Sequence, residues 1–465
     1  MTQDPPAPAS QRTRWFVLTA VSLGLLLATV DTSILYVVMP LLTDELSASV
    51  SESLWIINMY PLVMTGLLLG TGTLGDRFGH KLVFQIGISA FGIASLLAAF
   101  SPNAWVLIVA RALLAVGAAL MLPATLAIIR FTFENEDERN VAIAVWSSVS
   151  IGGIAFGPLV GGLLLEWFWW GSVFLINVPF ALVTFLLAAM YAPAARASAR
   201  TSWDLLSSVL ALVGLTGLVA AIKQGAVSAP SGAFITGALA TSFVCFWWFA
   251  RRQRRLPTPL LDFSVFRSRS VVAGVLAAGL ATFVFAGVGA VTSQHFQLVR
   301  GFSPLQSGLL LAAIAAGATV TSLLAGSVLS RVGPRRLLGA GCVVAGGGYA
   351  LATLVLEANL WMFAVSLFLA GTGIGVLITV ASSTIISNVS ADRAGMASGV
   401  EEVSYEFGSL ISVTLLGSIY AAFMAREPSC GTEGYQVSLA LAATACLVGF
   451  MGIALLLRSD RALSR

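Results

Sequence analysis

Residues 105–129 read WVLIVARALLAVGAALMLPATLAII, an apolar run interrupted by a single charged residue, Arg111. About 20 apolar residues in a row are enough for a helix to cross the hydrocarbon core of a bilayer. Apolar and polar residues do not alternate strictly along the run, so it predicts a helix and not a strand of a membrane barrel. The stretch therefore indicates a membrane-spanning helix that carries one cation.

The same pattern recurs along the whole chain. Of its 465 residues, 58% are hydrophobic and 10% are charged, and the mean hydropathy is +0.93, whereas a soluble domain is about 25% charged. We predict an all-α polytopic membrane protein, because a bilayer admits only helices and closed barrels. Fourteen apolar runs are expected to span the membrane: 15–40, 53–74, 82–100, 105–129, 141–165, 171–190, 205–222, 234–249, 270–296, 305–329, 337–356, 360–385, 399–423 and 437–457.

The basic residues predict the orientation of these spans. With a cytoplasmic N-terminus, 21 of the 25 Lys and Arg lie in inner loops and tails, and only Lys223, Arg300 and Arg426 lie in outer loops. This asymmetry is the positive-inside pattern. It predicts a multi-pass protein with cytoplasmic N- and C-termini. Arg also greatly outnumbers Lys, which points to a bacterial source, so we expect the bacterial cytoplasmic (inner) membrane. The net charge of +4 then reflects topology, and no nucleic-acid partner is expected.

The order of the spans predicts two related halves with an insert between them. GTLGDRFGHKL begins at Gly72 and GSVLSRVGPRR begins at Gly326, each after the second span of its half, although Ser330 replaces Asp76 in the later copy. Such internal similarity is typical of transporter folds built from repeats. We predict an N-terminal tail (1–14), a six-helix bundle (15–191), a linker with two inserted transmembrane helices (192–269), a second six-helix bundle (270–457) and a C-terminal tail (458–465).

GTLGDRFGHK places an acid, two bases and several glycines in one inner loop. Asp76 could lie against a neighbouring helix N-terminus while Arg77 and Lys81 bind opposite charges. We predict a latch that opens when the halves move relative to one another; the alternative is a solvated turn that follows the positive-inside pattern. The gating-loop residues are Gly72, Gly75, Asp76, Arg77, Gly79 and Lys81.

A second glycine motif, GIAFGPLVGG, lies in the fifth predicted span. Small residues at four-residue spacing let another helix approach closely, and Pro158 softens the helix. The motif could serve helix packing alone or also transport. Its residues are Gly153, Gly157, Pro158, Gly161 and Gly162.

These motifs resemble the signature set of the major facilitator superfamily, together with VDTSILYVVMP in the first span, RALLAVG from Arg111 and WGSVFLINVP from Trp170. The chain is most similar to the fourteen-span drug:proton antiporter branch (QacA/SmvA type) of multidrug efflux transporters. The resemblance implies two six-helix bundles plus two extra helices. It departs from that branch in the second span, where Asn58 in WIINMY replaces an acid that members often carry, and in the tenth span, which has no acid.

The resemblance implies proton-coupled efflux of lipophilic cationic drugs and antiseptics, such as quaternary ammonium compounds and dyes, by alternating access. The alternative is export of an amphipathic metabolite or a self-made antibiotic on the same scaffold. A membrane-embedded enzyme would need a nucleophile or metal cluster, and the sequence offers neither. We expect no cofactor, no metal, a proton gradient as the energy source, and a monomer.

GVEEVSYEFG, residues 399–408, puts three acids into the predicted thirteenth span. On a helix Glu402 and Glu406 share a face, whereas Glu401 points about 100° away from Glu402. A charged carboxylate at membrane depth is costly, so it faces a cavity or takes up a proton. We predict that these acids bind protons and cations. Alternatively, Glu401 and Glu402 form a solvated helix start at the inner interface.

Asp31 in the first span and Arg111 in the fourth are expected at similar depth in the outer half of the membrane. We predict that Arg111 binds Asp31 in one state and releases it in the other, so that the carboxylate gains and loses a proton. Arg111 could instead extend to the interface alone or bind backbone carbonyls.

Aromatic side chains could hold a bulky cation against their rings. A single aromatic residue in a span is also often lipid-facing or part of the core. The substrate-cavity candidates are Trp55, Asn58, Tyr60, Trp146 and Tyr405.

Overall fold

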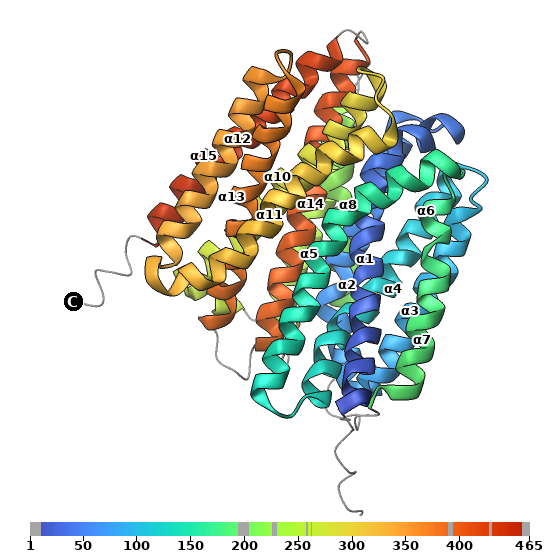
Figure 1. Cartoon of the computed structure of the whole chain (residues 1–465), viewed down its shortest axis with the longest axis vertical. Helices are drawn as coiled ribbons and strands as arrows, with labels where there is room; N and C mark the ends of the chain where they lie inside the picture. The colour runs from blue at the N-terminus through green and yellow to red at the C-terminus, as the bar shows by residue number, and fades with distance from the viewer. Residues whose placement is uncertain are drawn as a thin grey trace, which may run out of the picture.

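The structure is a computed structural model that describes residues 11–193, 204–225, 230–256, 259–261, 263–388, 394–426 and 430–457. Over these ranges the regular elements are all helices (Figure 1). This agrees with the all-α expectation, because inside a bilayer a helix satisfies all of its own backbone hydrogen bonds.

The first group of helices covers the predicted N-terminal half. Its sixth predicted span is a short helix, α6, followed by a longer one, α7, with Ile176 between them. The helices are α1 (Gln11–Glu45), α2 (Val50–Phe78), α3 (His80–Ala99), α4 (Ala104–Thr132), α5 (Glu136–Trp167), α6 (Ser172–Leu175) and α7 (Asn177–Tyr191).

The inserted segment and the second half follow in the predicted order. The insert contains α8 (Leu205–Gly225), α9 (Gly232–Gln253) and the 3₁₀ helix η1 (Phe263–Arg267). The second half contains α10 (Arg269–Leu298), α11 (Pro304–Val332), α12 (Pro334–Val355), α13 (Leu360–Ser387), α14 (Ala394–Met424) and α15 (Gly431–Leu456). The proposed boundaries at residues 192 and 269 stay a prediction.

Twelve stretches of described helix are long and apolar enough to cross a membrane, with α6 and α7 counted as one. The protein is therefore a multi-pass membrane protein. The remaining predicted spans, 53–74 and 141–165, lie in α2 and α5, which have 29 and 32 residues. Parts of these two helices have side chains outside the described structure. The count of fourteen spans stays a prediction.

The predicted gating loop is mostly helical. α2 continues to Phe78 and α3 begins at His80, so the connection is Gly79 alone, with φ of 95°. The later copy has the same construction, because Gly333, with φ of 84°, is the single residue between α11 and α12. Glycine adopts this left-handed region without the steric cost of a side chain. The shared turn extends the sequence similarity of the two halves to their backbone geometry.

The two groups of helices meet along two seams. α5 packs against α11, and α2 packs against α14, while α1 also contacts α10 (Figure 1). The inserted α8 packs on α9, and it also contacts α2 and α14. The insert therefore lies beside one seam between the halves.

An ion pair joins the two inserted helices at the predicted inner side. Arg252 donates from Nε and Nη2 to the carboxylate of Asp204 at 2.8 and 3.0 Å. Burial opposes the charge of Asp204, but the hydrogen bonds from Arg252 and Ser207 outweigh it and hold the pKa of this carboxyl below its usual value. The pair is therefore charged at neutral pH and fixes α8 against α9.

Candidate functional site

The centre of the first half is an ion pair between Asp31 of α1 and Arg111 of α4. Both side chains are almost completely buried, at 0% and 1% exposure, and Arg111 donates from Nη1 to Asp31 Oδ2. Asn177 donates from Nδ2 to the other carboxylate oxygen at 3.1 Å. A buried charge is tolerated only when its partners are in place. Three helices, α1, α4 and α7, therefore depend on one carboxylate.

Arg111 is held from two further directions. Its guanidinium lies 4.7 Å from the centroid of the Tyr60 ring, and its Nε donates to the carbonyl of Ile56 at 3.4 Å. The side chain does not extend to the membrane interface, as one alternative interpretation required. The Tyr60 ring was expected to face a transported cation, but in this structure it packs against the guanidinium of Arg111.

Asn177 was not among the residues selected from the sequence. It is the first residue of α7, directly after the helix break at Ile176, and Nδ2 also lies 3.3 Å from Ser95 Oγ. The available signal was an amide inside the apolar stretch WGSVFLINVP. Such an amide is costly at membrane depth unless it is hydrogen-bonded.

The three acids of α14 lie inside the helix. α14 begins at Ala394, so Glu401 lies about two turns beyond its start. Glu401 is buried and accepts a hydrogen bond from the Tyr405 hydroxyl at 2.9 Å and another from Ser382. The interpretation of Glu401 as part of a solvated helix start does not fit this burial.

Glu406 connects the acids of α14 to the ion pair of the first half. It is half-buried, and it interacts electrostatically with Glu402 on its own helix and with Arg111 on α4. Tyr36 of α1 also interacts electrostatically with Glu406 and Arg111, and its hydroxyl forms a hydrogen bond with Ser409 of α14. Glu406 of the second half thus lies close enough to the Asp31–Arg111 pair of the first half to interact with its charge, and we refer to these three residues as the polar centre.

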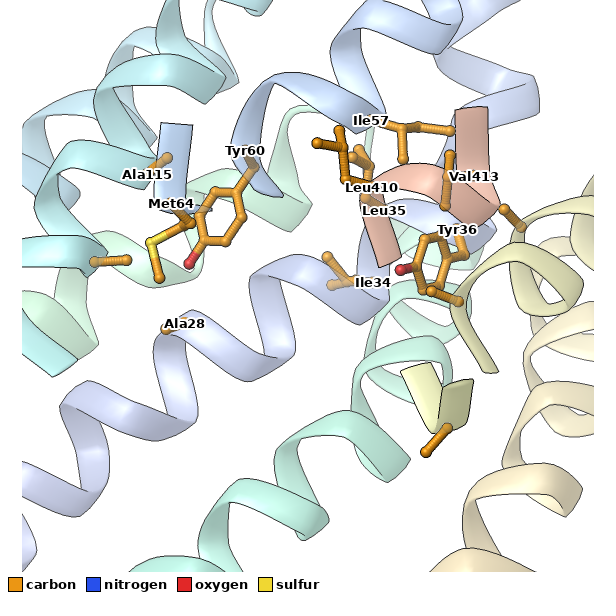
Figure 2. Packing of buried hydrophobic residues seen from close by; sticks show 14 of the residues in the cluster. Ala28, Ile34, Leu35, Tyr36, Ile57, Tyr60, Met64, Ala115, Leu410 and Val413 are labelled. Carbon is orange, nitrogen blue, oxygen red and sulfur yellow. The ribbon is translucent and has the colours of Figure 1, made fainter. Parts of the chain in front are cut away.

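An apolar layer lies next to this polar centre. Figure 2 shows Leu35 of α1 and Ile57 of α2 gathered with Leu410 and Val413 of α14, all of them buried. Leu410 follows Glu406 by about one helical turn, toward the predicted outer end of α14. The layer therefore separates the acids from the predicted outer face.

Further contacts join the halves at the same end. Gln297 of α10 donates to the carbonyl of Val37 in α1 at 2.8 Å. A side-chain carbon at Gly162 would lie 2.6 Å from the Cα atom of Leu305 in α11, so these helices touch through their backbones. The predicted outer ends of the two halves are thus closed against one another.

The remaining cavity candidates have different surroundings. Trp55 lines a cavity of about 320 Å³, and the centroid of its ring lies 4.0 Å from Lys223 Nζ. Trp146 donates from Nε1 to Thr125 Oγ1 at 3.1 Å. Asn58 is fully buried, and within the described residues neither its Nδ2 nor its Oδ1 has a hydrogen-bond partner. Lys223 itself lies in the last turn of α8 and not in an outer loop as predicted.

The gating-loop residues make contacts other than those expected. Lys81 Nζ donates to the carbonyl of Ala189 near the end of α7 at 2.8 Å. The partner of Lys81 is therefore the C-terminus of a helix, whereas an acidic side chain was expected. The guanidinium of Arg77 lies 5.1 Å from the Phe78 ring. A side-chain carbon at Gly75 would lie 2.2 Å from His80 Nδ1. The surroundings of Gly72 and of the Asp76 side chain lie outside the described structure.

The glycines of GIAFGPLVGG let α5 approach two helices at once. Added side-chain carbons at Gly153 and Gly157 would lie 2.0 and 1.9 Å from Thr29 Oγ1 and Ser33 Oγ of α1. At Gly161 such a carbon would lie 2.5 Å from Ile34 Cγ1. On the other side, the carbonyl of Pro158 lies where a side chain of Gly308 in α11 would be. The motif is therefore a packing surface for α1 and for the opposite half.

A multi-pass helical protein with two related groups of helices and buried ionisable groups between them has the construction of a secondary transporter. Among the described residues no cluster of His, Cys, Asp or Glu could hold a metal ion. Residues 21–318 and 274–465 match the model of the Major Facilitator Superfamily, and the chain belongs to this family. Family membership makes it a transporter-type protein and not an enzyme.

Several characterised proteins are similar along most of the chain. The multidrug efflux pump LfrA of Mycolicibacterium smegmatis is 37% identical, over 90% of this chain and 83% of the relative. The methyl viologen resistance protein SmvA of Salmonella typhimurium is 36% identical, over 92% and 87%. The tetracenomycin C resistance and export protein of Streptomyces glaucescens is 30% identical, over 90% and 78%.

The fold is also found among solved structures. A bacterial homologue of the human lysosomal transporter Spinster, in an inward-facing and unoccupied conformation, superposes with a TM-score of 0.70. The match covers 97% of this chain and 98% of the other chain, at 17% identity. At this identity the likeness supports the fold alone.

Proposed function

We propose that this protein exports lipophilic cations, such as quaternary ammonium compounds and dyes, in exchange for protons. The observation that carries the proposal is the polar centre, in which Glu406 acts electrostatically on Arg111 while Arg111 holds Asp31. Carboxylates at membrane depth bind either a proton or a cation. Competition between the two for the same acids couples their movements, because occupancy by one displaces the other.

The proposed cycle has two states, and the conformation in which the outer ends of the halves are closed is one of them. In this state the apolar layer seals the acids from outside, so a cation enters from the cytoplasm and displaces a proton. Opening of the outer ends then exposes the cation to the outside, where a proton replaces it. We propose fourteen spans, cytoplasmic termini and a monomer in the bacterial cytoplasmic membrane, with the proton gradient as energy source and no cofactor.

The similar proteins support export of drugs. Two of them are named for multidrug efflux and for methyl viologen resistance, and both align with about nine-tenths of this chain. A second candidate function is export of an amphipathic metabolite or a self-made antibiotic. The likeness to the tetracenomycin C resistance and export protein favours it. A panel of organic cations and neutral amphipathic compounds assayed in everted vesicles would separate the two.

The decisive test uses Glu406→Gln in proteoliposomes. We expect cation-induced proton release to fall to the background of empty vesicles, since the amide cannot take up the proton. Glu357→Gln is the matched control, because Glu357 lies exposed between α12 and α13, and it should behave as wild type. Unchanged proton release in Glu406→Gln would remove Glu406 from the coupling mechanism.

A further inference from the structure

The cavity beside Trp55 lies where the insert meets both halves. Its lining comes from α2, α8, α9 and α14 and includes Leu54, Lys223, Phe234, Ser418 and Ala421. The contributing segments are the first turns of α2, the last turns of α8 and α14, and the start of α9. The cavity is therefore at the predicted outer side of the membrane, at the level of the lipid headgroups.

Lys223 brings an uncompensated cation into this cavity. Its side chain is 7% exposed, and within the described residues no carboxylate lies within ion-pair distance of it. The ammonium has three hydrogens to donate, but its contacts are the carbonyl of Ser51 at 3.5 Å and the Trp55 ring. A buried ammonium without a counter-ion is costly, and an anionic occupant would keep this group charged.

A second polar group points to the same occupant. Ser418 lines the cavity, and its Oγ is buried and has no hydrogen-bond partner in the described part of the chain. Together the hydroxyl and the ammonium offer donors to an acceptor-rich group. The rest of the lining that the structure describes is largely apolar and contains no acid. This combination matches an anionic headgroup attached to an apolar tail.

We propose that this cavity binds the phosphate of an anionic phospholipid from the outer leaflet. The phosphate accepts hydrogen bonds from Lys223 and Ser418, and the acyl chains lie along the apolar lining formed by Leu54, Phe234 and Ala421. The size of the cavity, about 320 Å³, is in the range of small-molecule sites.

Lipid binding at this position bears on the transport cycle. The cavity is lined by α2 of the first half and α14 of the second, with α8 of the insert alongside. A lipid held there contacts both halves in the closed arrangement of their outer ends. It therefore stabilises this state, because a ligand favours the conformation to which it binds more tightly. The inserted helices complete the lipid site.

The test measures lipid retention by native mass spectrometry. The purified whole chain is stripped of lipid and then given phosphatidylglycerol or phosphatidylcholine. We expect the wild-type protein to retain one more phosphatidylglycerol than Lys223→Gln, and both proteins to retain phosphatidylcholine equally. Equal retention of phosphatidylglycerol would overturn the proposal. Displacement of the extra lipid by inorganic phosphate would overturn it too, because the site would then belong to free anions.

Three further variants sharpen the result. Arg426→Gln removes an exposed cation at the same membrane level and should leave retention unchanged. Glu427 lies outside the described residues, and Glu427→Gln should also leave it unchanged. A lipid gained only in this variant would overturn the proposal, because the Lys223 ammonium would then already be paired in the wild type. Ala421→Phe fills the cavity with the charge intact and should lose the extra lipid, including where Lys223→Gln fails to fold. Because the readout is lipid binding, its failure leaves the proposed antiport untouched.

Discussion

At the scale of single residues, the Asp31 carboxylate is the most demanding group of the first half. It is fully buried, and each of its oxygens accepts a hydrogen bond from a different helix. Removing one donor leaves part of a buried charge unsatisfied, which costs about 1–3 kcal/mol. The positions of α4 and α7 relative to α1 therefore depend on the same two bonds.

Asn177→Ala tests this dependence. We expect a lower melting temperature, corresponding to a loss of about 1–3 kcal/mol, together with slower cation-induced proton release. Thermal unfolding in detergent and proteoliposome assays measure the two effects. Ser95→Ala is the control, because Ser95 contacts Asn177 and not Asp31, and it should change both readouts less. Equal effects of the two substitutions would show that Asn177 matters only through packing.

The sequence revealed the charged members of the site more readily than the neutral ones. Asp31, Arg111 and Glu406 stand out because a charge in an apolar run is rare and costly. Asn177 carries no charge. Its hydrogen bond to Asp31 depends on the break between α6 and α7 at Ile176, which cannot be predicted from hydropathy. Lys223 was placed in a loop because the predicted span ended at residue 222, whereas α8 continues to Gly225.

At the scale of helices, the structure explains one glycine motif by a left-handed turn and the other by close approach of helices. The single-residue turns at Gly79 and Gly333 require a left-handed backbone, so the glycines of the repeat are fixed by geometry. The sequence predicted the motif but treated residues 72–81 as a loop, although α2 runs through most of them. Helix ends are the least reliable part of a sequence-based prediction, because capping decides them locally.

Gly157→Ala tests the packing of α5 on α1. The new methyl group would lie 1.9 Å from Ser33 Oγ and 3.1 Å from the backbone nitrogen of Ile34. Ser33 must therefore change its rotamer or the helices must move apart, and we expect roughly 1–3 kcal/mol of destabilisation together with reduced transport. Thermal unfolding and drug efflux from cells measure these effects. Gly152→Ala is the matched control, since its nearest neighbour would be Phe156 at 3.9 Å. Adding Ser33→Gly to Gly157→Ala should restore stability; a double variant no better than the single one would contradict the packing explanation.

At the scale of the whole molecule, hydropathy and charge asymmetry predicted the helical membrane fold, because a bilayer constrains the length and composition of every span. They did not predict which ends of the halves meet. That choice depends on contacts between side chains far apart in sequence, such as Ile57 with Leu410 and Val413 (Figure 2). Two such conformations of one chain commonly differ in free energy by a few kcal/mol, and a difference of this size cannot be predicted from a local sequence pattern.

Cross-linking α2 to α14 tests whether the closed outer ends belong to the transport cycle. A side-chain carbon at Gly417 would lie 2.8 Å from Leu54 Cδ2, so Leu54→Cys and Gly417→Cys lie within reach of a short bifunctional thiol reagent. The pair is made in a Cys430→Ser background, because Cys430 is half-buried at the same end. We expect the cross-linked protein to bind cations from the cytoplasmic side but to stop exporting them, since the outer ends can no longer separate.

The same experiment distinguishes a gate from a fixed contact. A cleavable reagent should restore efflux on reduction, and each single-cysteine variant should keep transporting after treatment. Equilibrium binding of a fluorescent cation and efflux from proteoliposomes are measured on the same preparation, so that loss of transport is separated from loss of binding. If the cross-linked pair exports cations at the wild-type rate, α2 and α14 stay together throughout the cycle. The outer exit must then open along the other seam, between α5 and α11.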